Sequence, residues 1–194
     1  TALPYVAMVD ADDRLGPMWL SEMLNHMQEG GYAALQSSLR AVSPSNFWSR
    51  GWDVYFQESI RPASNTNMVG HPSLYLTEAL LGARSDIGHE HEDTQLSIDF
   101  EQRSLRQGVA PVASYRIAPN SGRESVLKWR GYGRGYRDLA ARQPDKRGSI
   151  LRHLVWTIPL ERGWRPVLRG HLLQPLFAAA MSASIGYGFF LPKR

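Results

Sequence analysis

The chain opens with a short apolar segment that leads directly into three carboxylates. Residues 3–9 are apolar and include two β-branched valines, which indicates a buried strand. Asp10, Asp12 and Asp13 follow within four residues. Carboxylates this close repel one another unless a positive charge lies between them. A strand that ends in Asp-x-Asp therefore predicts an α/β sheet whose carboxyl edge carries a cation.

The residues that follow alternate between expected helices and strands. Besides the first strand, we predict strands at residues 32–39 and 109–117, and a short strand and turn before a helix at residues 74–81. Further helices are expected from Pro17 to a stop at Gly30 and Gly31, at residues 47–60, and at residues 92–107. Strands that alternate with helices are typical of an α/β layered domain.

Charge is distributed unevenly along the chain. Residues 1–122 carry 8 Lys or Arg against 14 Asp or Glu, a net charge of −6. Residues 123–194 carry 14 against 4, a net charge of +10. The acidic part suits cation binding and the basic part suits an anionic partner. Nucleic acid and an acidic lipid surface are both candidates for that partner.

The C-terminal tail favours the lipid surface. Residues 170–192 contain no charged side chain. A helix of about 20 residues is long enough to cross a bilayer core. Basic residues flank the run, with Lys193 and Arg194 at its end. Gln174 and Pro175 weaken it as a span, so a helix that lies in the membrane interface is the alternative.

The aspartate-rich turn is a candidate metal site. Carboxylate oxygens favour hard divalent cations such as Mg²⁺ or Mn²⁺, which also bind substrate phosphates. The chain has no cysteine, so disulfides and thiolate metal sites are excluded. The simpler interpretation is a solvated turn in which Asp12 or Asp13 caps the next helix.

A second group of carboxylates opens a helix further along the chain. Glu92 and Asp93 precede an amphipathic pattern that includes Leu96 and Phe100. A carboxylate at a helix N-terminus is oriented by free backbone N–H groups and the helix dipole. Asp93 is therefore either a helix cap only or a general base whose second oxygen faces a substrate.

Three segments, taken in order, carry a family resemblance. They are VDADDRLGPMWL at residues 9–20, GHEHEDTQLS at residues 88–97 and KWRGYGRG at residues 128–135. Together they resemble the signatures of family 2 glycosyltransferases, which include bacterial exopolysaccharide and lipid-linked sugar transferases. The resemblance implies a GT-A fold with a Rossmann-like mixed sheet, of which this chain holds the C-terminal part.

The resemblance also implies a role for each matching carboxylate. Asp10 and Asp12 would contact the sugar nucleotide, with Asp12 as the ligand of Mg²⁺ or Mn²⁺. Asp13 would support that pair. Asp93 would be the base that deprotonates the acceptor hydroxyl, and Glu92 would shape the acceptor site.

The third segment would contact the donor diphosphate and the acceptor. Trp129, Arg130 and Arg134 stand where the family has its Trp- and Arg-containing motif. Arginine is suited to bidentate phosphate contacts. The Gln-x-x-Arg-Trp motif of processive members is absent, which favours the addition of single sugars. The glycines of this segment would allow either a close approach to a phosphate or a bend at the membrane.

The implied activity is the inverting transfer of a sugar from a nucleotide sugar to a polysaccharide or lipid-linked hydroxyl acceptor. It would take place on the cytoplasmic side of a bacterial inner membrane, with an anionic membrane surface and no nucleic acid as partner. We expect a partial GT-A catalytic domain at residues 1–122, a basic helical juxtamembrane segment at residues 123–169 and an apolar transmembrane or interfacial helix at residues 170–194. The family's nucleotide-binding half is expected upstream of Thr1, so this fragment alone would be inactive.

Two other functions stay open from the sequence. A strand followed by Asp-x-Asp also fits a phosphohydrolase of the haloacid dehalogenase type, with Asp10 as the nucleophile and Asp12 as the acid/base. That class expects Thr or Val two residues after the second Asp, whereas Leu15 lies three after it. It also gives no role to Asp93. The third interpretation is a membrane-attached scaffold that has no turnover.

Overall fold

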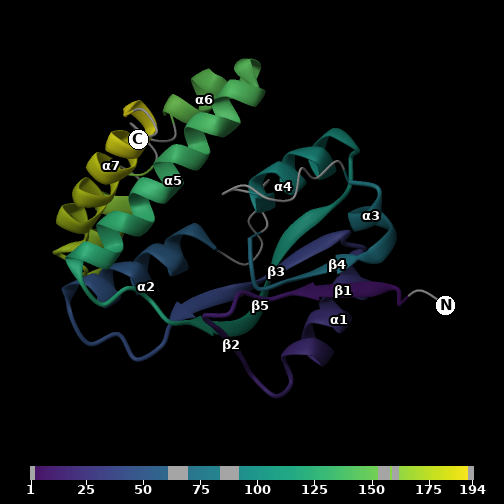
Figure 1. Ribbon diagram of the computed structural model, residues 1–194. Coiled ribbons are helices and arrows are strands. Elements are labelled where there is room, and N and C mark those ends of the chain that lie inside the picture. Colours follow the sequence, from purple (N-terminus) through teal and green to yellow (C-terminus); the bar gives the residue numbers. More distant parts are fainter. Residues whose placement is uncertain (1–2, 61–69, 84–91, 153–157, 159–161, 192–194) are drawn as a thin grey trace. The chain divides into compact units, whose positions relative to one another are not determined.

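The computed structural model describes residues 3–60, 70–83, 92–152, 158 and 162–191 (Figure 1). The side chains of Glu92, Lys146 and Ser149 lie outside that description. The chain divides into two compact units. The first consists of residues 1–42, 60–88 and 92–117, and the second of residues 43–59, 89–91 and 118–194.

The first unit is built on a five-stranded mixed sheet, which confirms the expected α/β class. Its strands are β1 (Tyr5–Met8), β2 (Asp13–Leu15), β3 (Ala34–Ala41), β4 (Ser73–Leu76) and β5 (Gln107–Arg116). They lie in the order β1-β4-β3-β5-β2. The β3–β5 pair is parallel and the other three pairs are antiparallel.

This topology brings several chain segments to one edge of the sheet. Strands β1, β3 and β5 run in one direction, and β2 and β4 run in the other. The carboxyl ends of the first three strands therefore meet the amino ends of the other two. Since β1 and β2 occupy opposite borders, residues 9–12 must pass along this edge to connect them.

Helices cover both faces of this sheet (Figure 1). On one face lies α1 (Trp19–Gly30), whose Trp19, Met23 and Met27 pack against Leu35 and Leu74 of the sheet. On the other face, a cluster of Ala34, Tyr75, Ala79 and Phe100 joins the sheet to α3 (Thr77–Leu81) and α4 (Glu92–Gln102). Alternate strand residues face opposite sides of a sheet, so neighbouring pairs such as Ala34 and Leu35 serve the two different clusters.

The largest differences between the expected and the observed elements are in three places. The helix predicted at residues 92–107 ends at Gln102, because Ser104 adopts a positive φ of 56° and β5 begins at Gln107. The helix predicted at residues 74–81 begins only at Thr77, since the residues before it pair with β1 and β3 as β4. Strand β2 was not predicted from the sequence. The predicted stop of the first helix is confirmed, because Gly31 takes the left-handed conformation there with φ 59°.

Strand β5 contains an irregularity where it pairs with β3. Ser37 pairs with Ala110, but Ser38 pairs with Ala113, so two extra residues of β5 lie between the two pairs. One of them is Pro111, which has no N–H group to donate to a ladder. Such a bulge bends and twists the strand.

The second unit is helical. Its elements are α2 (Phe47–Ser59), α5 (Gly122–Arg142), η1 (Pro144–Lys146), α6 (Arg147–Arg152), η3 (Arg165–Arg169) and α7 (Gln174–Phe190). Helix α5 begins at the N-cap Ser121, whose hydroxyl accepts from Glu124 N at 3.2 Å, while the Glu124 side chain accepts from Asn120 N at 3.1 Å. An aromatic cluster joins α2, α5 and α7, with Trp52 stacked on Trp129 at 5.6 Å between ring centroids.

The glycines of the KWRGYGRG segment do not interrupt α5. Gly131, Gly133 and Gly135 are buried within this continuous helix. A Cβ at Gly133 would overlap the carbonyl oxygen of Ile185, and a Cβ at Gly188 would overlap the carbonyl oxygen of Arg130. Gly133 and Gly188 therefore let the backbones of α5 and α7 touch, a role that the sequence did not suggest.

The apolar tail is shorter as a helix than its composition suggested. Its helical part is α7, which has 17 residues and packs against α5. Within the described residues, no helix combines the length and the apolar character needed to cross a membrane.

Candidate active site

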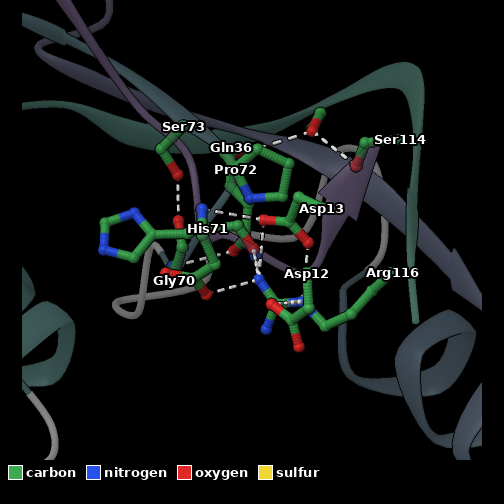
Figure 2. A network of polar contacts seen from close by, with 11 residues as sticks. Asp12, Asp13, Gln36, Gly70, His71, Pro72, Ser73, Ser114 and Arg116 are labelled. Carbon is green, nitrogen blue, oxygen red and sulfur yellow. Dashed lines mark hydrogen bonds and ion pairs between the residues drawn. The ribbon is translucent and has the colours of Figure 1, made fainter. Parts of the chain in front are cut away.

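Arg116 is the centre of a polar network at the shared edge of the sheet (Figure 2). Its guanidinium forms a fork with Asp13, in which Nε donates to Oδ1 at 2.7 Å and Nη2 donates to Oδ2 at 2.8 Å. The Asp13 side chain is 0% exposed and that of Arg116 is 12% exposed. Such a bidentate, desolvated pair is among the stronger polar contacts in proteins.

The other two aspartates of the turn lie around the same guanidinium. Arg116 Nη2 donates to Asp10 Oδ2 at 2.7 Å, and Nε lies 3.8 Å from Asp12 Oδ1. Both carboxylates are substantially exposed, at 42% for Asp10 and 38% for Asp12. The turn itself is closed by the Asp13 N–H, which donates to the Asp10 carbonyl at 3.0 Å. Asp10 and Asp12 are therefore the two exposed carboxylates of the turn, and Asp12 makes the longer contact to Arg116.

The three carboxylates stabilise the charge on Arg116. Burial by itself would lower the pKa of this guanidinium. The hydrogen bond and charge of Asp13, followed by the charges of Asp10 and Asp12, outweigh burial and raise the pKa above that of an ordinary arginine. Arg116 thus supplies the positive charge among the carboxylates that the sequence interpretation had assigned to a metal.

Residues 70–73 form a turn that is tied to the same network. Arg116 Nη2 donates to the carbonyl of His71 at 3.0 Å. The buried Gln36 of β3 accepts from Gly70 N at 3.0 Å through Oε1. The backbone N–H and hydroxyl of Ser37 both donate to the carbonyl of Pro72. Strands β3 and β5 therefore hold this turn together.

Asp93 lies against this turn at the N-terminus of α4. Its Oδ1 accepts from Thr94 N at 2.6 Å, as expected for a carboxylate at a helix start. Its Oδ2 lies 3.1 Å from the point that a Cβ at position 70 would occupy, and Gln36 Nε2 lies 3.3 Å from the same point. A glycine at position 70 thus leaves room beside Asp93. The contacts run from Asp93 through Gly70 and His71 to Arg116 and the aspartates.

The other predicted site residues either lie in the second unit or have side chains outside the described part of the chain. Trp129 is fully buried in the aromatic cluster, so its indole serves packing. Arg130 is half-buried and its guanidinium lies 4.2 Å from the ring centre of Tyr187. Arg134 is exposed on α5. The side chain of Glu92 is outside the described part of the chain.

Arg116 is a residue that the sequence analysis missed. The one available signal was its position, because residues 112, 114 and 116 share a face of the predicted strand. Val112 and Ser114 are buried, and an arginine on the same face requires carboxylate partners. The alternation between buried and exposed positions was hard to recognise, because the aromatic Tyr115 is on the exposed face.

The fit of a divalent cation to this edge follows from charge and exposure. Three carboxylates and one guanidinium carry a formal charge of −2, which a divalent cation would neutralise. Mg²⁺ is commonly bound by only one or two carboxylates together with substrate phosphates. Asp12 meets that requirement, since it is exposed and lies 3.8 Å from Arg116. Among the described residues, no group of three or more His, Asp or Glu side chains forms a ready-made metal site.

A mixed α/β sheet that gathers aspartates, an arginine and a helix-terminal carboxylate at one edge defines an enzyme-type, ligand-binding α/β domain. The chain matches the family model described as Glycosyl transferase family group 2 over residues 5–191, and it belongs to that family. The match spans most of both units and confirms the predicted resemblance; the mixed sheet with its helices is consistent with a GT-A-like domain. No curated protein matches the chain.

Proposed function

We propose that this protein transfers a sugar from a nucleoside diphosphate sugar to a hydroxyl acceptor with inversion at the anomeric carbon. Family membership supports glycosyl transfer in general. The residue assignment is supported by one observation, the continuous set of contacts that joins Asp10, Asp12 and Arg116 to the turn beside Asp93. Polysaccharide or lipid-linked acceptors fit the apolar and basic C-terminal half.

The proposed reaction is a single in-line displacement. Asp93 Oδ2 removes the proton of the acceptor hydroxyl while the acceptor oxygen forms a bond to the anomeric carbon. The bond between that carbon and the diphosphate oxygen breaks, and its electron pair leaves with the nucleoside diphosphate. Thr94 N–H holds Oδ1 of Asp93, which leaves Oδ2 beside Gly70, 3.1 Å from the point that a Cβ would occupy.

Asp12 would hold Mg²⁺ or Mn²⁺, and Asp10 would contact the donor beside it. A bound cation would supply Lewis-acid stabilisation of the charge that develops on the leaving diphosphate. Arg134, which is exposed on α5, and Arg130 would add positive charge at the diphosphate. Trp129 would support this segment by packing, and Glu92 would lie next to the acceptor.

The test is donor turnover by the full-length protein. We expect nucleoside diphosphate release from at least one of UDP-glucose, UDP-N-acetylglucosamine and GDP-mannose in the presence of Mn²⁺ or Mg²⁺, and its loss in EDTA. Asp12→Asn should raise the half-saturating Mn²⁺ concentration at least about 100-fold, because outer-shell partners of a metal alone contribute 10- to 100-fold. Glu22→Gln, an exposed carboxylate on α1, is the matched control.

Other outcomes identify the competing functions. Phosphate release from p-nitrophenyl phosphate that is abolished by Asp10→Asn would establish the hydrolase, which the family match does not favour. Turnover that is unaffected by EDTA would refute the metal assignment. The absence of turnover with every donor and acceptor tested would favour the scaffold.

We also propose that the second unit contacts an anionic membrane surface, on the cytoplasmic side of a bacterial inner membrane. Five large apolar side chains are exposed at the start of α7 and in the segment before it: Trp164, Leu168, Leu172, Leu173 and Leu176. No acidic residue follows Glu161. Exposed apolar groups beside basic side chains are the features that bind interfacial helices to acidic lipid.

The combined substitution Leu168→Asp and Leu172→Asp should weaken membrane binding at least about 100-fold, since burial of each leucine contributes about 1.5 kcal/mol or more. Flotation of the purified chain with vesicles that contain phosphatidylglycerol measures this. Leu81→Asp, an exposed leucine of the first unit, should have no effect. Equal flotation of all three proteins would contradict the proposal.

A further inference from the structure

Arg116 uses its nitrogen atoms unequally. Nε and Nη2 make all of its hydrogen bonds to the described residues: Nε donates to Asp13, and the two hydrogens of Nη2 are shared among Asp10, Asp13 and the carbonyl of His71. These partners come from two separate segments, the turn after β1 and the turn before β4. A single planar guanidinium therefore joins two turns that are far apart in the sequence.

The second of these turns carries no charge of its own that would explain the contact. Arg116 binds a backbone carbonyl there, so the bond fixes the path of the chain at residues 70–73. Gln36 fixes the same turn from the other side through Gly70 N. Asp93 Oδ2 lies against Gly70, so the position of this turn determines the space in front of the carboxylate.

We propose that Arg116 is a positioning residue that couples the donor side of the site to the acceptor side. It orients Asp10 and Asp13, and thereby the exposed Asp12, and through His71 it holds the turn that borders Asp93. The inference rests on the proposed function, in which Asp12 serves the cation and Asp93 the acceptor. Lysine cannot replace it, because an ammonium lacks the planar fork that binds Asp13 through two nitrogens.

The test compares Arg116→Lys with Arg14→Lys, an exposed arginine of β2, in the full-length protein. The Mn²⁺ dissociation constant, measured from the electron paramagnetic resonance signal of free Mn²⁺ with UDP or GDP present, needs no turnover. We expect Arg116→Lys to raise this constant and to lower kcat/KM for the acceptor, each by about 10-fold or more, as for other partners that orient metal ligands. Arg14→Lys should change neither quantity.

A second variant separates coupling from a simple loss of folding. Gln36→Leu keeps the size of the buried side chain and removes its one hydrogen bond to the described residues, the bond to Gly70. It should lower kcat/KM for the acceptor and leave the Mn²⁺ dissociation constant unchanged. The Mn²⁺ titration also gives the concentration of binding sites, and kcat/KM is calculated from that concentration, so a reduced yield of folded protein does not imitate the result.

Three outcomes overturn one hypothesis or the other. If Arg116→Lys behaves like Arg14→Lys, or alters Mn²⁺ binding alone, Arg116 does not couple the two sides. If Gln36→Leu leaves the acceptor kinetics unchanged, the turn does not control the space at Asp93 and the inference also fails. If the unsubstituted protein neither binds Mn²⁺ nor releases nucleoside diphosphate, it is the proposed function that fails.

Discussion

Replacing Asp93 by Asn should reduce sugar transfer by about 1,000-fold, within the range that general base catalysis contributes. The amide cannot accept the proton of the acceptor hydroxyl, although it has nearly the same size and can still accept from Thr94 N. The half-saturating Mn²⁺ concentration should stay as in the unsubstituted protein, because Asp93 lies beside Gly70 and makes no contact with Arg116 among the described residues. Initial rates at saturating donor and acceptor measure the loss.

The matched control for this variant is Glu101→Gln, an exposed carboxylate on the same helix α4. It should keep full activity. If Asp93→Asn retains normal turnover, Asp93 is only a helix cap, which was the simpler interpretation of its sequence position. A parallel loss of Mn²⁺ binding would show instead that the substitution disturbs the aspartate turn.

Replacing Asp13 by Ala should lower the free energy of unfolding by about 3 kcal/mol, the lower end of the range for breaking a buried ion pair. The substitution removes the fully buried partner of Arg116 and leaves the guanidinium 12% exposed with Asp10 as its closest carboxylate. The remaining contact to Asp10 is the reason for choosing the lower end. Urea unfolding measures the change.

Asp10→Ala provides the comparison within the same turn. Its carboxylate is 42% exposed, so its removal should cost less than about 1 kcal/mol, as is typical of solvent-screened pairs. If the two variants lose the same free energy of unfolding, the bidentate bond between Asp13 and Arg116 stabilises the fold no more than the contact with Asp10. Together the two variants compare the contribution to stability of the buried Asp13 with that of the exposed Asp10.

The candidate site residues that the sequence predicted are marked by their immediate neighbours. Asp10 and Asp12 follow an apolar strand, and Asp93 opens an amphipathic helix, so the local pattern was sufficient to single them out as candidates. Arg116 escaped because its role depends on pairing with residues more than 100 positions away. The same reason explains why β2 was not predicted: three residues become a strand only because β5 lies beside them.

The α5 segment shows a second limit of reasoning from local sequence. Glycines destabilise isolated helices, and those of the KWRGYGRG segment suggested a possible bend in the chain. The structure has a continuous helix through Gly131, Gly133 and Gly135, because a neighbouring helix packs against its backbone. The loss in helix propensity is offset by tertiary contacts that are encoded about 50 residues further along the chain.

The long sequence separation between Asp13 and Arg116 has a consequence for synthesis on the ribosome. The acidic turn leaves the exit tunnel before its cation, because Arg116 is translated 103 residues after Asp13. During that interval its carboxylates stay hydrated and mutually repelling, and β2 has no strand to pair with. The polar network at this edge of the sheet therefore forms only after Arg116 has been translated.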